Sequence, residues 1–359
     1  MSHRNFGLDL LRTIAIMAVL GFHASPLFPL PEVLSAIAAR GWMGVDLFFV
    51  LSGYLIGQQT LSLADRPNGP FFRRCTTFWI KRWTRTVPLY VVVLFCYLVV
   101  KPAFLHAPFV GGFNWKWLVF SQNFGQVRDF GQSWSLCIEE QFYFVFPLIA
   151  FSFRRMPRLF WLLPLVISVA LRLVVARHLS NAQTGEVLLT PEAYVETFRF
   201  PTFMMLDAIS VGVFLASCRP IWNAWPRTVR QACAPIGALI VGFVGCYLPQ
   251  FPTHALAIAL MYTALAIGFG ALLVAAEQWQ YMPAGLRFVQ WIALCSYSVY
   301  LWHEMFTRFF DRYVHYGAWQ FQLLAYLVFV MAFSKLSYEW VEKPGISLRQ
   351  RIFRQPEAR

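Results

Sequence analysis

A histidine and an arginine share one face of the first apolar stretch of the chain, residues 6–24. Arg12 and His23 are eleven residues apart, which on a helix separates them by about 16 Å along the axis and turns them to nearly the same face. Ionisable groups inside a bilayer normally face a cavity or a partner. The pair therefore either lines a functional cavity, or combines an arginine that reaches the membrane surface with a buried structural histidine.

Two adjacent carboxylates, Glu139 and Glu140, interrupt the apolar stretch SWSLCIEEQFYFVFP, residues 133–147. Neighbouring helix positions point about 100° apart, so one carboxylate can face a cavity while the other pairs with another helix. A buried carboxyl group can act as an acid, a base or the partner of a histidine. We expect a functional role, because a purely structural pair is costly at that depth.

Basic residues precede the third apolar stretch, in FWIKRWTRTVPLY at residues 78–90. Arg82 and Arg85 are three positions apart and share a helix face. Arginine grips phosphate through two parallel hydrogen bonds, which makes the pair a candidate phosphate clamp. The alternative is an ordinary set of basic membrane anchors.

Four further residues are candidates for substrate binding: Asp46, Trp134, Arg172 and His303. Asp46 either caps a helix or faces a site. Arg172 and Asp207 each lie inside an apolar stretch, and an interhelical ion pair is the alternative explanation for both. His303 follows two tyrosines in SYSVYLWH.

Composition indicates which elements position these residues. Of the 359 residues, 58% are hydrophobic and only 13% are charged, whereas soluble proteins are about a quarter charged. We predict an all-α, polytopic membrane protein that forms a single integral-membrane domain over residues 1–359, with Ser52 and Gly53 allowing close helix packing. About ten spans, each near the ~20 residues that a bilayer requires, are expected at 5–25, 41–60, 86–105, 134–153, 158–177, 197–216, 230–248, 255–276, 288–309 and 319–341.

Basic residues set the predicted orientation. Lys and Arg sort as nineteen on the side of both termini against eight on the other, which predicts cytoplasmic N and C termini. Membrane topology explains the net charge of +13 better than nucleic-acid binding, because the basic residues lie in short loops. Seven scattered cysteines without a CxxC pair, and no His/Cys cluster with zinc spacing, predict no metal site. No cleavable signal peptide is expected, since the first apolar stretch is charged.

Depth along the expected spans predicts two polar layers. The upper layer, in the outer half of the membrane, holds His23, Glu139, Arg172 and His303. The lower layer, on the order of 15 Å away near the cytoplasm, holds Arg12, Arg82, Arg85, Lys335 and Glu342. This arrangement suits a long phosphate-bearing donor that reaches upward along the first span from a basic mouth.

Taken together, the motifs resemble the membrane acyltransferase 3 family, which O-acylates bacterial surface carbohydrates and related glycosides. The resemblance covers nearly the whole chain and rests on six motifs in the expected order, which are LDLLRTIAIMAVLGFH, GVDLFFVLSGYLIG, Arg82-x-x-Arg85, WSLCIEEQFYFVFP, SYSVYLWH and YEWVEKP. It implies about ten transmembrane helices in the bacterial inner membrane, an acyl-CoA donor (commonly acetyl-CoA) and a sugar hydroxyl acceptor. Some members carry an additional SGNH esterase-like domain; this chain resembles the form without it, acting alone or with polysaccharide-assembly proteins.

By this resemblance His23 is the expected catalytic base, and Arg82 and Arg85 match the family's Arg-x-x-Arg motif. The expected mechanism places the phosphates of acetyl-CoA on these two arginines and on Arg12. Neutral His23 then takes the proton of the acceptor hydroxyl as that hydroxyl attacks the thioester.

Glu139 and Glu140 match the family's acidic motif, and either one is expected to orient the imidazole. Arg172, Trp134 and Ser135 are the candidates for stabilising the oxyanion. Direct transfer and a covalent acyl-enzyme both stay open at this point.

The expected activity is transfer of an acyl group, acetyl first, from cytoplasmic acyl-CoA to a sugar hydroxyl of an exopolysaccharide, lipopolysaccharide or related glycolipid. The main alternative is a transporter or flippase of polysaccharide precursors, and a third is a non-catalytic assembly partner. Transporters often repeat Gly/Pro-broken helices in both halves. The sequence has no such symmetry, which favours the enzyme.

Overall fold

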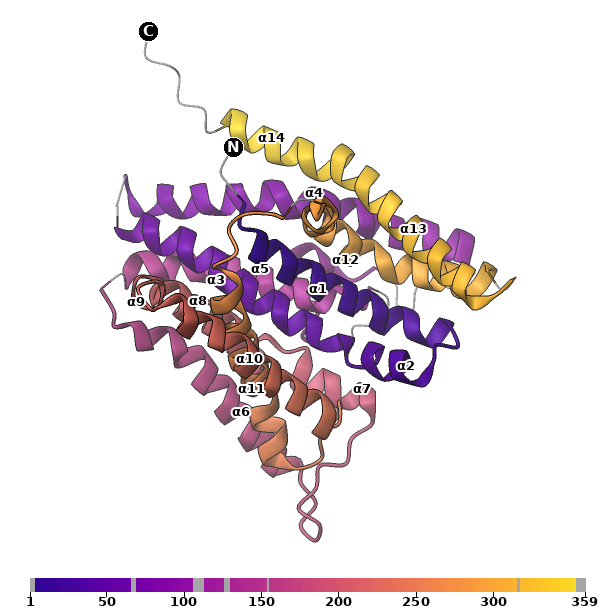
Figure 1. The fold of residues 1–359 in the computed structure, drawn as a ribbon, viewed down its shortest axis with the longest axis horizontal. Coiled ribbons are helices and arrows are strands. Elements are labelled where there is room, and N and C mark those ends of the chain that lie inside the picture. The colour runs from indigo at the N-terminus through magenta and orange to yellow at the C-terminus, as the bar shows by residue number, and fades with distance from the viewer. Residues whose placement is uncertain are drawn as a thin grey trace.

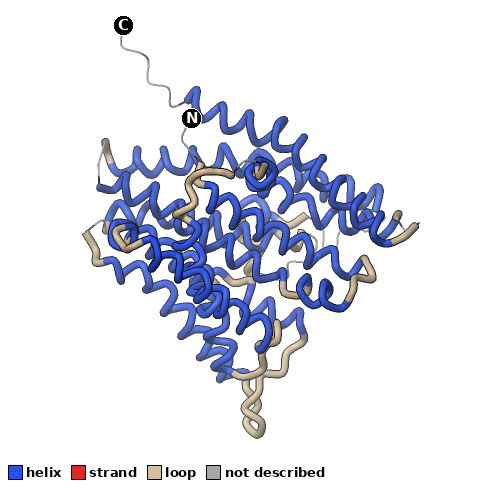
Figure 2. Tube along the Cα trace, viewed as in Figure 1, coloured by secondary structure: helices blue, strands red, loops and turns tan. Residues whose placement is uncertain are grey.

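The chain forms a bundle of tilted helices (Figure 1), and the residues that the structure describes contain no β-strand (Figure 2). The computed structural model describes residues 4–65, 69–105, 113–125, 130–153, 155–283, 285–314 and 317–352. The α-helices are α1 (Phe6–Ala24), α2 (Glu32–Ala38), α3 (Gly44–Asp65), α4 (Phe71–Leu105), α5 (Ser133–Ser152), α6 (Leu163–Leu179), α7 (Pro191–Tyr194), α8 (Asp207–Ser217), α9 (Arg219–Asn223), α10 (Arg227–Tyr247), α11 (Ala255–Ala276), α12 (Arg287–Tyr313), α13 (Trp319–Ser337) and α14 (Lys343–Ile352).

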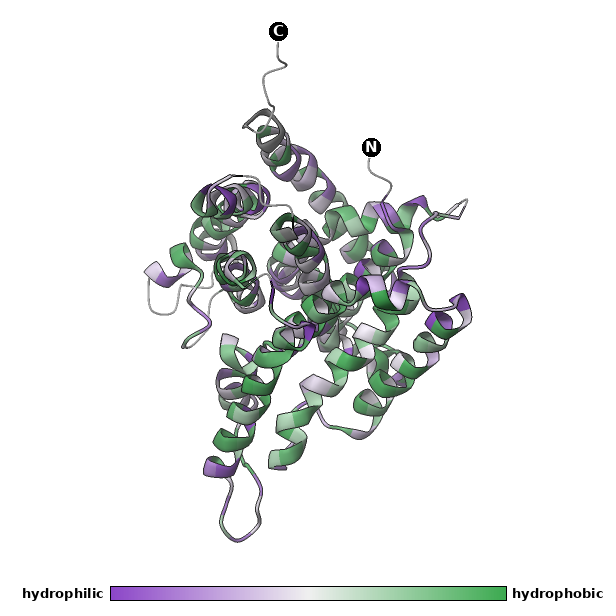
Figure 3. Ribbon diagram, turned by 90° about the vertical axis from the view of Figure 1, so that its left-hand side faces the viewer, coloured by the Kyte–Doolittle hydropathy of each residue, from purple (hydrophilic) through white to green (hydrophobic). Residues whose placement is uncertain are grey.

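The surface of the bundle is apolar, as a lipid environment requires. Large side chains such as Leu239, Phe243 and Phe321 are 59–74% exposed, and hydrophobic residues colour most helical turns in Figure 3. Seven helical segments of the described residues are long and apolar enough to cross a membrane. The protein is therefore a polytopic α-helical membrane protein. The helices α5 and α12 fall outside these seven because polar side chains lower their hydropathy.

Helices α1 and α12 lie side by side and run in the same direction. The hydroxyl of Thr13, in the first half of α1, donates to the carbonyl oxygen of Val289, in the first turn of α12, at 2.9 Å. Near their ends the ring of His23 packs against that of His303. We call the end of the bundle with Arg12, Arg82 and Arg85 the arginine end, and the end with these two histidines the histidine end.

Helices α3 and α8 approach each other at glycines. A Cβ atom on Gly53 would lie 2.2 Å from the carbonyl oxygen of Ile209, and one on Gly212 would lie 2.3 Å from that of Val50. Only glycine fits at such separations, which is how small residues bring membrane helices together. The predicted close packing at Gly53 is confirmed.

The single sixth span predicted for residues 197–216 is wrong. The chain there forms a π-helical turn (Val195–Arg199), a 3-10 turn (Thr202–Met204) and then the short helix α8. Pro201 cannot donate a backbone hydrogen bond, and polar side chains satisfy the freed backbone instead. Asn123 donates to the carbonyl of Phe200 at 3.0 Å and Ser168 to that of Phe203 at 2.8 Å.

Helix α5 begins inside the bundle rather than at a membrane surface. The side chain of Gln132, which precedes it and is 4% exposed, donates to the carbonyl oxygen of Leu301 on α12 at 2.9 Å. Glu139 lies six residues beyond Ser133, about 9 Å along the axis towards the arginine end. The prediction that Glu139 shares a layer with His23 is therefore wrong, because it counted depth from a surface that α5 does not reach.

Candidate active site

A cavity of about 130 Å³ lies among α1, α3, α4, α5 and α12. It follows the boundary between two core clusters, and the side chains of Phe48 and Tyr300 contact both clusters. Its polar lining consists of Arg12, Ser52, Arg82, Arg85, Thr86, Ser135, Glu139, Tyr143, Ser296, Tyr297 and Tyr300.

Three predicted donor-binding arginines meet at this cavity. Arg82 and Arg85 project into it from α4, which starts at Phe71 and so carries both within the helix, while Arg12 projects from α1. The guanidinium of Arg82 donates to Gln59 Oε1 at 2.7 Å. Three cations from two helices around one space make a donor set that fits phosphate groups.

The cavity adjoins wider clefts at the arginine end. Arg12 and Leu55 also border a cleft of about 480 Å³, and Leu55 borders another of about 1090 Å³. Gln58 and Arg219 line both clefts. A bulky polar group can therefore occupy the arginine end while a narrow one extends into the cavity.

Both predicted carboxylates lie near the arginines. Glu139 lines the cavity together with Arg82 and Arg85, beside the hydroxyl pair of Ser52 and Tyr143 at 2.6 Å. Glu140 is 4% exposed, lies near Thr86, and neither of its carboxylate oxygens has a hydrogen-bond partner among the described residues.

The two predicted histidines meet at the histidine end. The ring centroids of His23 and His303 are 4.8 Å apart. The carboxylate of Glu304 lies beside them, and accepts hydrogen bonds from Arg308 at 2.7 Å and from the backbone N–H of Gln132 at 3.1 Å. Neither histidine belongs to the lining of the cavity.

Tyr300 stands between the cavity and the histidines. Its hydroxyl group, at the cavity, lies 2.5 Å from Ser135 Oγ and donates to the carbonyl oxygen of Gln132 at 2.9 Å. Its ring centroid lies 5.6 Å from that of His303. Tyr300 therefore closes the cavity at the end nearer the histidines.

The expected path along the first helix, from Arg12 to His23, is wrong. Ile16 and Leu20 lie four and eight positions beyond Arg12, on the face that would line such a path, and both are fully buried in a core cluster. The cavity instead leads along α3, α5 and α12 to Tyr300.

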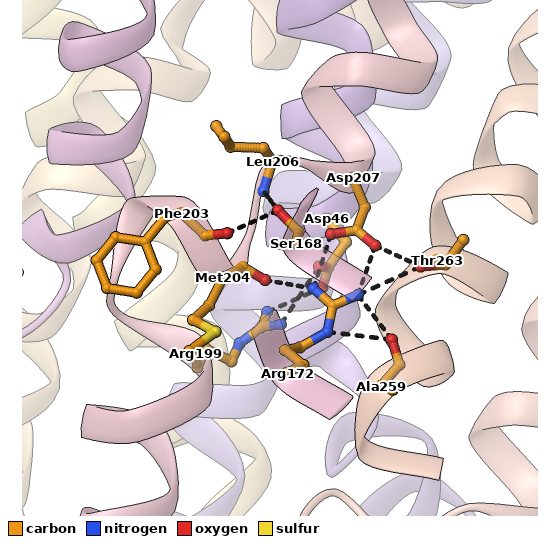
Figure 4. Close-up of polar contacts among 10 residues, drawn as sticks. All are labelled: Asp46, Ser168, Arg172, Arg199, Phe203, Met204, Leu206, Asp207, Ala259 and Thr263. Atoms are coloured by element: carbon orange, nitrogen blue, oxygen red, sulfur yellow. Dashed lines mark hydrogen bonds and ion pairs between the residues drawn. The ribbon is translucent and has the colours of Figure 1, made fainter. Parts of the chain in front are cut away.

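Arg172 lies in a separate buried cluster (Figure 4). Its guanidinium pairs with the carboxylate of Asp207 at 2.6 Å, and it also donates to the carbonyl oxygens of Met204 and Ala259. The alternative prediction of an interhelical ion pair is thus confirmed. Because the arginine is fully buried and binds backbone freed by the break before α8, its contacts are structural.

Asp46 and Trp134 both contact Arg199, which forms a second buried ion pair next to that of Arg172 and Asp207. Asp46 accepts from Arg199 at 2.8 Å (Figure 4), and rings of Trp42, Trp134 and Tyr262 surround that guanidinium at 4.9–5.2 Å. None of Asp46, Trp134, Arg172 and His303 lines the cavity.

Sequence reasoning missed four residues of the site: Ser52, Tyr143, Tyr300 and Glu304. The sequence pattern indicates only a packing role for Ser52, and Tyr300 lies in the motif SYSVYLWH without an expected role. The available signal was position on the helix, since Tyr143 lies four residues after Glu139 and therefore shares its face.

Comparison with known sequences gives one family and several relatives. The profile of the family described as "Acyltransferase domain" (Acyl_transf_3) matches residues 5–338. Peptidoglycan O-acetyltransferase OatA of Listeria monocytogenes is 25% identical over 94% of this chain and 55% of its own length. O-acetyltransferase OatA of Staphylococcus aureus is 26% identical over 94% of this chain and 56% of its own length. The chain thus spans about half the length of the curated relatives it matches, and no solved structure matches it.

Proposed function

Because the chain belongs to the acyltransferase 3 family, whose profile spans residues 5–338, we propose that it transfers an acetyl group from acetyl-CoA to a hydroxyl group of a bacterial surface carbohydrate. The names of both OatA proteins support the acetyl group, and the word peptidoglycan in one of them supports a glycan acceptor. Exopolysaccharide and lipopolysaccharide are acceptors of the same chemistry. The protein would act in the inner membrane with its arginine end towards the cytoplasm.

One observation carries the proposal: a cavity lined by three arginines ends at Tyr300, directly beside a pair of histidines. In this proposal Arg12, Arg82 and Arg85 bind the phosphates of acetyl-CoA, since charge-assisted arginine–phosphate bonds are strong. The nucleotide occupies the wider clefts at the arginine end, and the thioester arm extends towards Tyr300.

In the transfer step, His23 acts as a general base. It takes the proton of the acceptor hydroxyl while the hydroxyl oxygen attacks the thioester carbon. The C–O bond forms, the C–S bond breaks, and the departing thiolate takes the proton back from His23. Because Tyr300 separates the cavity from His23, this step requires the phenol side chain to leave Ser135 and turn aside.

The broken helix before α8 would also suit a transporter, since transporters bind substrates at such breaks. Its freed carbonyl groups at Phe203 and Met204, however, already accept hydrogen bonds from Ser168 and Arg172. The break is therefore filled by the protein itself, which favours the enzyme.

The test uses the purified full-length chain in lipid vesicles with radiolabelled acetyl-CoA on the side of the arginine end. Glycan acceptors (peptidoglycan fragments, lipopolysaccharide and exopolysaccharide, each de-O-acetylated) are supplied on the opposite side. We expect label to appear as an alkali-labile ester on one of them. Movement of unmodified glycolipid across the vesicle membrane without acetyl transfer would show that the protein is a flippase and not an acetyltransferase.

A further inference from the structure

We infer that His303 is a positioning residue for His23, accepting a hydrogen bond that fixes the orientation of the catalytic imidazole. The inference rests on the function proposed above, because it assigns a partner to the base of that reaction. It replaces the expectation that Glu139 or Glu140 orients His23.

The imidazole of His303 is held in one protonation pattern. Its side chain is fully buried, and its Nδ1 lies 2.7 Å from the backbone carbonyl oxygen of Tyr300. A carbonyl oxygen only accepts hydrogen bonds, so Nδ1 carries the proton and Nε2 of a neutral ring is an acceptor. This Nε2 atom is buried and has no hydrogen-bond partner among the described residues. A buried acceptor without a partner is costly and calls for a donor.

His23 is placed to supply that donor. The two ring centroids are 4.8 Å apart with the planes tilted by 60°. Ring nitrogens lie off the centroid, so a rotation of the partly buried His23 side chain brings one of its N–H groups to the ~2.9 Å of a hydrogen bond with Nε2 of His303. The second nitrogen of His23 is then unprotonated and free to act as the base.

Glu304 supplies a negative charge that compensates the positive charge of protonated His23. Its carboxylate is fixed by Arg308 and by the backbone N–H of Gln132, and its charge acts on both imidazoles. Arg308 offsets part of this effect at His23. When His23 takes a proton from the acceptor, the imidazolium thus faces a neutral acceptor in His303 and a negative charge in Glu304.

Glu139 and Glu140 are not placed to orient His23. Glu139 lines the cavity with Arg82 and Arg85, and Tyr300 separates that cavity from both histidines. A base–orienter pair needs hydrogen-bond contact. Among the described residues, the ring packed directly on His23 from a neighbouring helix is that of His303.

The experiment compares two substitutions in the full-length protein in lipid vesicles. His303→Leu removes the acceptor, and we expect kcat to fall about 100-fold, the lower range for a general base that is no longer aligned, while KM for acetyl-CoA is unchanged. His303→Gln retains a side-chain acceptor, and we expect it to restore kcat to within about tenfold of the unsubstituted protein. Phe306→Leu, one turn further along α12, is the control for a packing defect and should leave kcat unchanged.

A second measurement needs no active variant. Comparing the ¹⁵N-histidine NMR spectra of the unsubstituted protein and His303→Gln identifies the signal of His303. The chemical shifts of that signal should be those of a neutral ring protonated at Nδ1. A ring protonated at Nε2 would overturn the inference, as would an unchanged kcat in His303→Leu. If the unsubstituted protein transfers no acetyl group, the proposed function fails; if it transfers and His23→Gln is inactive while His303→Leu is not, only the role of His303 fails.

Discussion

The phenol ring of Tyr300 packs 5.6 Å from the imidazole of His303 on one side, while its hydroxyl group bonds to Ser135 at the end of the arginine-lined cavity on the other. The residue thus belongs to both halves of the site. The proposed transfer of an acetyl group from one side of the membrane to the other needs such a barrier, since an open path would expose the thioester to water.

Removing the side chain of Tyr300 should uncouple hydrolysis of acetyl-CoA from acetyl transfer to the acceptor. We expect Tyr300→Ala to raise the hydrolysis of acetyl-CoA without acceptor severalfold, because water then reaches the cavity from the histidine end. Tyr300→Phe keeps the ring and loses the hydrogen bond to Ser135, so its hydrolysis should lie between those of Tyr300→Ala and the unsubstituted protein. Release of free thiol from acetyl-CoA measures both, and equal rates in all three proteins would argue against a barrier.

Removing one cation from the cavity should weaken donor binding. A hydrogen bond to a charged group contributes about 1.5–3 kcal/mol, so Arg85→Ala should raise the Kd for acetyl-CoA about 10- to 150-fold. Arg73→Ala makes the same charge change on α4 away from the cavity lining and should leave Kd unchanged. Equilibrium binding of radiolabelled acetyl-CoA in detergent distinguishes the two. Similar affinities in both variants would show that Arg85 does not bind the phosphates of acetyl-CoA.

Replacing His23, the proposed base, should lower the rate of transfer without weakening acetyl-CoA binding. We expect His23→Gln to lower kcat by about 10²–10⁴-fold, the usual contribution of a general base, without changing the Kd for acetyl-CoA, because His23 lies outside the cavity lining. His254→Gln, at an exposed histidine, is the matched control. A loss of donor binding in His23→Gln would contradict the separation of the two halves of the site.

Much of the helical fold could be predicted from hydrophobic length alone. Most of the expected spans coincide with observed helices to within a few residues, for example 255–276 with α11. The span expected at 86–105 starts too late, since the basic first turns of α4 extend the helix back to Phe71. The failure at 197–216 has another physical source: apolar length says nothing about backbone that the protein satisfies internally. Residues 195–206 are broken because Asn123, Ser168 and Arg172 bind their carbonyl groups, and these partners are distant in sequence.

Some residues of the candidate site could be predicted from the sequence, whereas Asp46, Trp134 and Arg172 lie outside the cavity. His23 and His303 meet, and Arg12, Arg82 and Arg85 share a cavity. Glu139 was placed too high because depth was counted from the end of an expected span, whereas α5 starts beside Leu301. Tyr300 carried no charge and therefore no signal, although it decides where the cavity ends.

The buried pair of Arg172 and Asp207 should affect stability rather than transfer. Breaking a buried ion pair costs about 3–5 kcal/mol when one charge is left unpaired. We expect Arg172→Met to be the more damaging change, because it also removes the hydrogen bonds from Arg172 to the carbonyl oxygens of Met204 and Ala259. Asp207→Asn should cost less, since an amide oxygen at the position of Oδ2 still accepts from both Arg172 and Thr263.

Thermal unfolding in detergent, followed by loss of the monodisperse peak in size-exclusion chromatography, measures this difference. The midpoint should fall further for Arg172→Met than for Asp207→Asn, while the protein that remains folded at low temperature keeps the acetyl-CoA affinity of the unsubstituted chain. The double variant Arg172→Met/Asp207→Leu removes both charges, yet it should recover only part of the lost stability because the carbonyl oxygen of Met204 still lacks its donor. A double variant as stable as the original would show that the single variants lose stability through the unpaired charge. The hydrogen bonds from Arg172 to the freed backbone before α8 would then contribute nothing.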